Sequence, residues 1–205
     1  MTTVVLASNN AKKLAELRRI LEPLVPGITV LGLSDVASYP EPAETEVSFE
    51  GNALLKARAC VAATGLPSLA DDSGLCVDAL NGMPGVLSAR WAGVAKADGA
   101  DAANNRLLLA QLADTPAERR GARFECVMAL VLPDGNECVA HGSMAGVILD
   151  SEVGGGGFGY DPLFQPEGET VASAQLVPEA KDAISHRGRA LRAIAPVVAE
   201  ALRVD

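Results

Sequence analysis

Aromatic residues are scarce in this chain of 205 residues, at 3% of the sequence against 49% for hydrophobic residues as a whole. The core must therefore be mainly aliphatic, and each aromatic residue is worth locating. Apolar runs of membrane-spanning length are missing, and Met1–Thr3 leads into a strand-like run without the basic and apolar regions of a secretory signal. We therefore expect a soluble, cytoplasmic protein with no membrane partner.

Cysteine pairs of the C-x-x-C type are also missing. Cys60, Cys76, Cys126 and Cys138 are far apart in apolar runs, where cysteine behaves as a small hydrophobic residue, and this favours a reducing compartment. Positive charge is in deficit, because the net charge is −9. Nucleic acid is therefore a poor partner, since its phosphates attract contiguous Lys and Arg. A small phosphate ligand would need a locally basic site or a divalent metal ion.

What the chain does contain begins with an apolar run, a polar turn and a helical pattern. Thr3–Ala7 predicts a strand and Ala11–Leu21 a helix, with leucines at helical spacing. The pair Asn9–Asn10 can cap this helix, and the uncapped amides of its first turn would attract an anion. Lys12 and Lys13 lie in that first turn, where cations oppose the helix dipole. Cations in such an unfavourable position beside free amides suggest that they bind phosphate. Solvated surface lysines are the plainer alternative.

A second helix follows an acidic loop. We expect a strand at Ile28–Leu33, a proline-rich acidic loop at Ser38–Glu46 and a helix from about Ser48 to Thr64. Asn52 and Lys56 lie four residues apart and so share one face of that helix. They point either at the same cleft as the lysines of the first helix or at water.

Two adjacent acids, Asp71 and Asp72, follow the apolar run Pro67–Ala70 and precede Ser73–Gly74. We interpret the run as a buried strand that ends in a turn. Alternation of side chains sends the two acids in different directions, so we expect different roles. One would brace the turn, and the other would face a cleft at the carboxyl end of the strand. An Asx turn with no catalytic role is the alternative.

The second half of the chain changes the pattern. It predicts a strand at Leu75–Leu80, a helix at Asp101–Leu112, and strands at Phe124–Leu132 and Glu137–Leu149 joined by a hairpin turn at Pro133–Asn136. The last two strands either extend the sheet or form a second lobe, inserted at roughly residues 115–150 of a single domain, 1–205. The fold class is α/β, with a mixed, elongated central sheet, helices on both sides and two lobes flanking a cleft.

Gly154–Pro162 is the most unusual segment, with a run of glycines before two aromatic residues. Glycine lets backbone approach a ligand closely, and an aromatic ring offers a flat face to a nucleobase. A flexible linker is the less favoured alternative. Further on, Lys181, His186 and Arg187 gather before a closing helix, which Pro196 should kink or restart. Beside a base-stacking loop, these three become candidates for binding a base edge or a phosphate.

Together these motifs resemble the inosine/xanthosine triphosphate pyrophosphatases. Six ordered motifs carry the resemblance: Ser8–Lys13, Phe49–Ala53, Ala70–Gly74, Gly82–Gly85, Gly157–Pro162 and Ser185–Arg187. It implies a nucleotide cleft and Mg²⁺-dependent hydrolysis of ITP, dITP and XTP to the nucleoside monophosphate and pyrophosphate, which cleanses the nucleotide pool. It also implies a homodimer whose small-molecule partner is a nucleoside triphosphate.

The same resemblance implies roles for individual residues. It assigns the triphosphate to Ser8, Asn9, Asn10, Ala11, Lys12 and Lys13, with Lys13 as the main cation. Asp72 would be the proton acceptor and a Mg²⁺ ligand, and Ser73 a substrate contact. The base and the sugar phosphate would be held by Phe158, Gly159, Tyr160, Asp161, Lys181, His186 and Arg187. Glu44 would be the second metal carboxylate, because Glu44-Thr45-Glu46 is the better match to the Glu-Thr-Gly common in the family, and Glu41 is the alternative.

The implied chemistry follows from charge. Mg²⁺ and the lysines would neutralise the phosphate oxygens while a carboxylate takes a proton from the water that attacks the α-phosphorus. Donors aimed at O6 of the base, from His186, Arg187 or the amides near Phe158–Gly159, would refuse the 6-amine of ATP. No residue in the sequence accounts for refusal of GTP. A pyrophosphatase for other modified nucleotides and a nucleotide-binding module without activity are the alternatives, and Asp72 and Lys13 weigh against the second.

Overall fold

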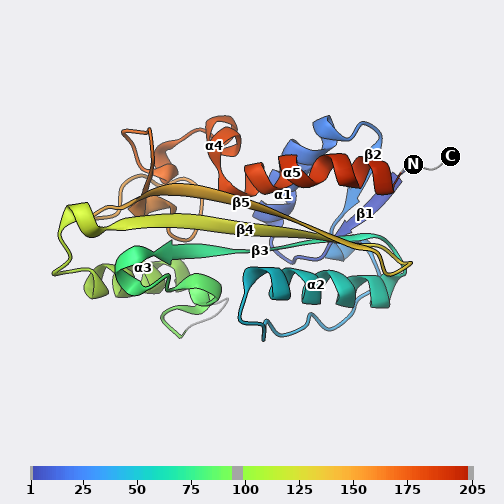
Figure 1. Cartoon of the computed structure of the whole chain (residues 1–205), viewed down its shortest axis with the longest axis horizontal. Coiled ribbons are helices and arrows are strands. Elements are labelled where there is room, and N and C mark those ends of the chain that lie inside the picture. Colours follow the sequence, from blue (N-terminus) through green and yellow to red (C-terminus); the bar gives the residue numbers. More distant parts are fainter. Residues whose placement is uncertain (1, 94–98, 203–205) are drawn as a thin grey trace. The chain divides into compact units, whose positions relative to one another are not determined.

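The computed structural model describes residues 2–93 and 99–202. Within these ranges six strands form one sheet in the order β2-β1-β3-β4-β5-β6, flanked by helices (Figure 1). The first strand, β1 (Thr2–Leu6), pairs in parallel with β2 (Ile28–Leu31) and with β3 (Ser68–Val77).

At the other end of the sheet, β5 (Glu137–Ile148) pairs antiparallel with the short strand β6 (Phe164–Pro166). Between β3 and β5 lies β4 (Gly121–Val131), and the expected turn at Pro133–Asn136 joins β4 to β5. Parallel and antiparallel pairs thus share one sheet, which confirms the mixed α/β class. No helix built from the described residues is both long enough and apolar enough to cross a membrane.

The chain divides into two compact units. The first holds the described residues of Met1–Asp72, Cys126–Gly142 and His186–Asp205, and the second those of Ser73–Glu125 and Ser143–Ser185. β3, β4 and β5 each contribute residues to both units. The second lobe expected at residues 115–150, and a nucleotide cleft beside it, stay predictions.

The first helix, α1 (Ala11–Leu24), begins where the sequence predicts. Asn10 caps it, because its side-chain oxygen accepts hydrogen bonds from two backbone N–H groups of the first turn. Leu17 and Leu21 on its inner face are buried in the core. The apolar spacing that predicted this helix is therefore the face that packs.

The second helix, α2 (Phe49–Thr64), is also confirmed. The Ser48 hydroxyl accepts a hydrogen bond from the Gly51 N–H at 3.1 Å and caps the helix. It ends at Gly65, whose φ of 69° is left-handed and suits glycine. The start and the end of α2 are both set by local sequence.

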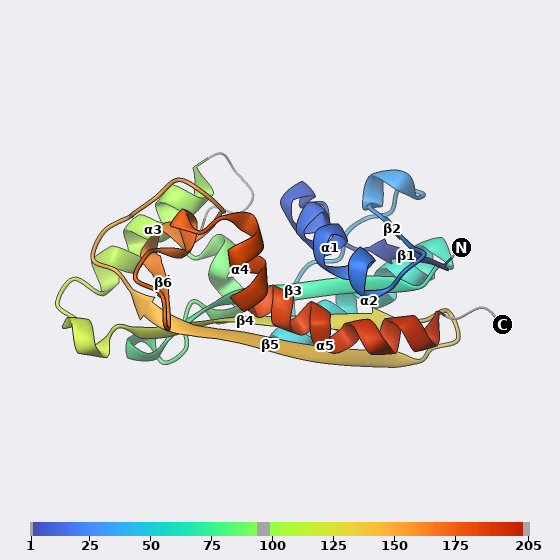
Figure 2. The same cartoon turned by 90° about the horizontal axis from the view of Figure 1, so that it is seen from above.

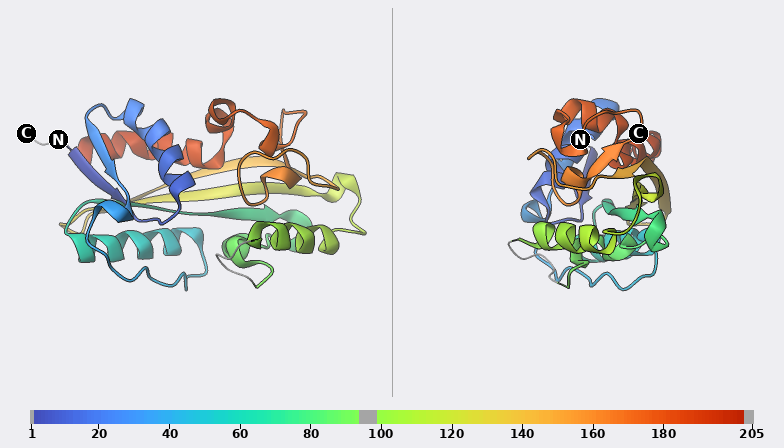
Figure 3. Two further views of the ribbon diagram at one scale, coloured as in Figure 1. Left: turned by 180° about the vertical axis from the view of Figure 1, so that it is seen from behind. Right: turned by 90° about the vertical axis from the view of Figure 1, so that its left-hand side faces the viewer.

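Apolar layers cover both faces of the sheet in the first unit. Aliphatic residues of α1 and α5 (His186–Ala201) pack on one face, and small residues of α2, among them Ala53 and Ala57, pack on the other. Figure 2 shows α1 and α5 lying side by side, and Figure 3 shows α2 again on the opposite face. A strand in the middle of this unit is thus buried on both sides.

β3 corrects the sequence interpretation. It is one continuous strand of ten residues, so the expected turn at Asp71–Gly74 and the separate strand at Leu75–Leu80 are wrong. Residues 78–80 form a short 3-10 helix instead. Asp71 and Asp72 are 3% and 6% exposed within the strand. The strand continues through them because each acid finds charged or amide partners on its own face of the sheet, as described below.

The second unit is built around α3 (Ala100–Gln111) and an apolar cluster that includes the rings of Phe124 and Phe164, whose centroids lie 4.7 Å apart. Lys181 lies on a short helix, α4 (Pro178–Ile184), in a segment for which no separate helix was predicted from the sequence.

The closing helix, α5, starts earlier than expected. His186 and Arg187 are its first residues, so they do not precede it as the sequence predicted. The helix also continues through Pro196 without a restart. His186 and Arg187 belong to the first unit, whereas Lys181 belongs to the second.

Candidate active site

The segment Ser8–Lys13 joins β1 to α1, and its polar atoms are largely engaged with one another. Asn10 Oδ1 accepts from the N–H groups of Lys12 and Lys13 at 3.0 and 3.2 Å, and Ser8 Oγ accepts from the Asn10 N–H at 3.2 Å. The prediction of uncapped first-turn amides is therefore wrong for Lys12 and Lys13. A phosphate at this turn would reach those two amides only if the Asn10 side chain moved.

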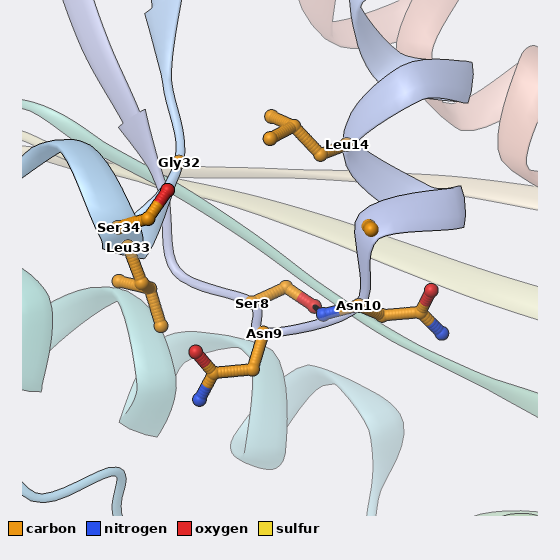
Figure 4. A pocket seen from close by; sticks show the side chains of 8 residues that line it. Ser8, Asn9, Asn10, Leu14, Gly32, Leu33 and Ser34 are labelled. Atoms are coloured by element: carbon orange, nitrogen blue, oxygen red, sulfur yellow. Dashed lines mark hydrogen bonds between the residues drawn. The ribbon is translucent and has the colours of Figure 1, made fainter.

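A small cavity opens beside this turn (Figure 4). It holds about 120 Å³ and is lined by Ser8, Asn9, Asn10, Ala11, Leu14, Gly32, Leu33 and Ser34. Leu14 approaches it from α1, while Leu33 and Ser34 come from the segment after β2. The cavity adjoins the residues to which the resemblance assigns the triphosphate.

Asp71 anchors a cluster of buried charges on the α1 and α5 face of the sheet. Its Oδ2 lies 2.8 Å from Lys13 Nζ and 3.3 Å from both Arg187 Nε and Nη2. Arg187 Nη1 donates to Glu16 Oε2 at 2.6 Å. Two cations thus meet two carboxylates, and the cluster is formally neutral.

The charges of this cluster fix its protonation. Burial opposes ionisation of Asp71, but the charges of Lys13 and Arg187 outweigh it and hold its pKa well below the usual range. Burial likewise opposes the charge of Arg187, whose pKa is nonetheless raised by Asp71 and Glu16. Asp71 is therefore an ionised structural partner of Lys13.

Asp72 points to the opposite face of the sheet, toward α2. Asn52 Nδ2 donates to Asp72 Oδ2 at 3.1 Å, and Lys56 Nζ lies 3.2 Å from Asp72 Oδ1. Lys56 Nζ also lies 3.0 Å from Glu44 Oε1 in the acidic loop. The expected divergence of the two acids is thus confirmed, and the stripe of Asn52 and Lys56 faces Asp72 and not water.

The environment of Asp72 shifts its pKa in the direction opposite to that of Asp71. Burial raises the pKa of Asp72, and the negative charge of Glu44 raises it further, against the opposing effects of Lys56 and Asn52. The pKa of Lys56 is raised, because Asp72, Asp71 and Glu44 outweigh its burial. Two neighbouring carboxylates with divergent pKa values are a common sign of divided catalytic roles.

The acidic loop distinguishes its two candidate metal ligands. Glu44 shares Lys56 with Asp72, whereas Glu41 Oε2 accepts a hydrogen bond from Asn9 Nδ2 at 2.9 Å. Among the described residues there is no group of three or more His, Cys, Asp or Glu side chains able to hold a metal ion. Glu44 and Asp72 nevertheless suit Mg²⁺, which takes one or two protein carboxylates together with waters and phosphate oxygens. Both carboxylates contact the Lys56 ammonium group, which makes the pair the candidate position for a cation.

In the second unit, Asp161 organises the glycine-rich loop. Its Oδ2 accepts from the Phe158 N–H at 2.8 Å and from Lys181 Nζ, and its Oδ1 accepts from Ser173 Oγ at 3.0 Å. Lys181 Nζ lies 5.4 Å from the centre of the Phe158 ring, within cation–π range. The loop presents a half-buried Phe158 ring backed by a lysine.

The remaining residues of the loop are already occupied. The Gly159 N–H donates to Asp101 Oδ2 at 2.7 Å, and Tyr160 is 4% exposed with its hydroxyl donating to the Ser88 carbonyl at 2.9 Å. Tyr160 therefore anchors the loop in the core. The amides of Phe158 and Gly159, expected as donors to a base, both serve carboxylates of the protein.

The residues predicted from sequence fall into two groups. Ser8, Asn9, Asn10, Ala11, Lys12, Lys13, Glu44, Asp72, His186 and Arg187 belong to the first unit, and Ser73, Phe158, Gly159, Tyr160, Asp161 and Lys181 to the second. Contacts within the first unit join Lys13, Asp71 and Arg187, and separately Glu44 and Asp72. A single site that combines both groups stays a prediction.

Sequence reasoning missed Glu16, Asp101 and Asn105 altogether and left Asn52 and Lys56 undecided. The helical spacing of Asn52 and Lys56 was a usable signal, because only one stripe of α2 could face Asp72. Glu16 lies three residues after Lys13 on α1, but its partner Arg187 is 171 residues away, and no local pattern reveals that pairing.

Comparisons with known proteins identify the family of this chain. The model of the Ham1 family matches residues 4–197. A dITP/XTP pyrophosphatase of Nocardia farcinica is 62% identical over 200 residues, which cover 97% of this chain and 96% of that protein. A dITP/XTP pyrophosphatase of Streptomyces coelicolor is 54% identical over 202 residues, covering 98% and 100%.

Solved structures give the same result. A nucleoside-triphosphatase / dITP/XTP pyrophosphatase of Mycobacterium abscessus is 56% identical, with a TM-score of 0.77 and coverage of 95% of this chain and 99% of that one. A HAM1 protein of Coxiella burnetii is 40% identical, with a TM-score of 0.87 and coverage of 98% and 100%. The chain therefore belongs to the Ham1 family.

Proposed function

We propose that this protein hydrolyses deaminated purine nucleoside triphosphates, namely dITP, XTP and ITP, to the nucleoside monophosphate and pyrophosphate. The observation that carries the proposal is the pair of half-buried Glu44 and buried Asp72 around Lys56, two carboxylates able to hold a cation beside a polar turn. Relatives named dITP/XTP pyrophosphatase over nearly their whole length support the substrate class.

Asp72 acts as the general base. Its raised pKa and its burial suit a carboxylate that takes a proton from water. The water oxygen then attacks the α-phosphorus, the bond from that phosphorus to the bridging oxygen breaks, and pyrophosphate leaves. Asn52 holds the Asp72 carboxylate through Oδ2, which leaves Oδ1 to the cation side.

Glu44 and Asp72 would hold Mg²⁺, which when bound supplies charge neutralisation to the phosphate oxygens. These two carboxylates and Lys56 carry a combined formal charge of −1, and without the lysine the two carboxylates carry −2, which a divalent ion between them would neutralise. Lys56 then has a free ammonium group to turn toward phosphate.

Lys13 and the Ser8–Lys13 turn bind the triphosphate. Lys13 uses one donor on Asp71 and has two others for phosphate oxygens. Because Asn10 already caps α1, its side chain turns away when phosphate takes over the first-turn amides. The turn thus exchanges one acceptor for another and stays satisfied.

The base is held by Phe158, backed by Lys181. To refuse ATP, the site needs hydrogen-bond donors aimed at O6 of the base. The hydrogen bonds described above already engage three of the donors that the sequence suggested. Arg187 is engaged with two carboxylates, and the Phe158 and Gly159 amides are engaged with Asp161 and Asp101. Lys181 is likewise engaged with Asp161, so each of these donors would have to leave a carboxylate before it could bind O6.

The protein acts in the cytoplasm as a homodimer that cleanses the nucleotide pool. The four cysteines are free thiols in the structure, which suits a reducing compartment. The net charge of −9 is unfavourable for a nucleic acid partner. Sedimentation at several protein concentrations tests the dimer.

A turnover panel tests the function. ITP, XTP, dITP, GTP, ATP and dTTP are each incubated with protein and MgCl₂, and pyrophosphate and orthophosphate are measured separately. We expect pyrophosphate from the first three alone, and none after addition of a chelator. Orthophosphate as the first product, or equal turnover of GTP and dITP, would contradict the proposal. For the variant Asp72→Asn, the matched control is Glu118→Gln, which changes an exposed acid outside both groups of predicted site residues.

A further inference from the structure

Two side chains of α3 bind the backbone of the same residue of the glycine-rich loop. Asp101 Oδ2 accepts from the Gly159 N–H at 2.7 Å, and Asn105 Nδ2 donates to the Gly159 carbonyl at 3.2 Å. Asp101 and Asn105 are four residues apart and so lie on one face of the helix. The backbone polar groups of Gly159 are therefore both bound by α3.

The orientation of Asn105 is determined by its neighbours. Its Nδ2 also donates to Glu152 Oε1 at 2.8 Å, so both groups that it meets are acceptors. A flipped amide would place oxygen against two oxygens, which fixes the assignment. Asn105 is 3% exposed, and its Oδ1 has no hydrogen-bond donor within residues 2–93 and 99–202.

The loop has a backbone that needs such support. Gly157 and Gly159 have φ values of 72° and 62°, in the left-handed region. A Cβ on Gly157 would collide with the Asp161 carboxylate, which itself accepts the Phe158 N–H. Phe158 is thus fixed on one side by Asp161 and on the other by the bonds of α3 to Gly159.

We propose that Asp101 and Asn105 are positioning residues that hold the backbone N–H and carbonyl of Gly159 and thereby set the position of the Phe158 ring for the base. The proposal rests on the proposed function for its effect on substrate, but the holding of the loop does not. Neither residue lies in the six motifs that carry the resemblance to the pyrophosphatases, and their hydrogen bonds described above go to Gly159 and Glu152.

The test combines amide hydrogen exchange with steady-state kinetics in Asp101→Ala, Asp101→Asn and Asn105→Ala. Asp101 is exposed, so its replacement leaves the packing of the core unchanged. Asn105 is buried, so thermal unfolding is measured to check that Asn105→Ala still folds. Gln111→Ala is the matched control, because it removes an α3 side-chain hydrogen bond that goes to Trp91 and not to the loop.

In Asp101→Ala we expect exchange of the Gly159 amide, and KM for dITP, to rise about tenfold, as for loss of one charge-assisted hydrogen bond. We expect kcat to stay within about twofold, because transition-state contacts at the phosphates are untouched. Asp101→Asn, which keeps an acceptor oxygen, should restore most of both values. Asn105→Ala should resemble Asp101→Ala, and Gln111→Ala should match the parent protein.

Unchanged exchange and KM in Asp101→Ala would overturn the proposal. So would a lower KM in that variant, since Asp101 would then compete with substrate for the Gly159 amide. If the parent protein releases no pyrophosphate from dITP, the proposed function fails. The exchange measurement then still decides whether α3 holds the loop.

Discussion

Arg187 and Asp71 are 116 residues apart in the chain, yet Arg187 Nε and Nη2 both lie 3.3 Å from Asp71 Oδ2. Both side chains are buried, and Glu16 takes the remaining side of the guanidinium group. Arg187 is therefore a counter-ion inside the protein, and it shares Asp71 with Lys13. Its expected role as a donor to substrate stays a prediction.

Replacing Arg187 should destabilise the fold far more than replacing a surface arginine with equally good geometry. Arg187→Met leaves Asp71 and Glu16 buried without their partner, at an expected cost of about 3–5 kcal/mol in the free energy of unfolding. Arg58→Met removes two hydrogen bonds of 2.7 Å to Glu137 at an exposed site, at an expected cost of at most about 1 kcal/mol. Urea denaturation compares the two, and equal losses would contradict a buried structural role.

Asp72→Asn should abolish release of pyrophosphate and leave the fold intact. Loss of a general base lowers the rate by about 10²–10⁴-fold. Because burial and Glu44 raise the pKa of Asp72, its ionised form is unfavourable in the folded state, so the neutral variant should unfold at a higher temperature. Kinetics of dITP hydrolysis together with calorimetry check both effects. An active variant, or an inactive one that unfolds earlier, would count against this assignment.

Lys56→Gln should make the fold more dependent on Mg²⁺. Without the ammonium group, Glu44 and Asp72 repel each other, so the variant should unfold at a lower temperature in chelator and gain more from added MgCl₂. A ligand at about 100 times its Kd stabilises by about 2.7 kcal/mol. Arg58→Gln on the same helix is the control, because Arg58 pairs with Glu137 instead. Equal gains in both variants would show that Lys56 does not compensate for the cation.

Alkaline pH should destabilise the protein through Cys126. Burial, and then the charge of Asp71, raises the pKa of Cys126 to about 12, so the folded state keeps a proton that the unfolded chain loses above about pH 8.5. The folded state then binds more protons, and stability falls as pH rises, by at most about 1.4 kcal/mol per pH unit for one group. Urea denaturation from pH 7 to 10 should show a shallower decline for Cys126→Ala. Parallel curves would contradict this source of the pH dependence.

The sequence allowed the helices to be predicted wherever local signals decide. The caps Asn10 and Ser48, and the leucines of α1, gave the positions of α1 and α2 to within a few residues. The hairpin before β5 followed from its turn residues. These features depend on neighbours in sequence, so they can be predicted from the sequence alone.

Other features depend on partners that are distant in sequence. Two acids followed by Ser-Gly favour a turn, and β3 passes through them only because Lys13, Arg187, Asn52 and Lys56 satisfy them from both faces. The same holds for the glycine-rich loop, whose amides are bound by carboxylates that include Asp101 on α3. Long-range charge pairing is what the sequence alone could not supply.

β3 also constrains how this chain can evolve. Its side chains alternate, so gain or loss of one residue between Ser68 and Asp71 would turn the Asp71 position toward α2 and the Asp72 position toward α1. One such change would re-pair both ion clusters at once, because each would meet the other acid at a different position along the strand. We therefore expect this chain to tolerate substitutions along the strand more readily than a change in the number of its residues.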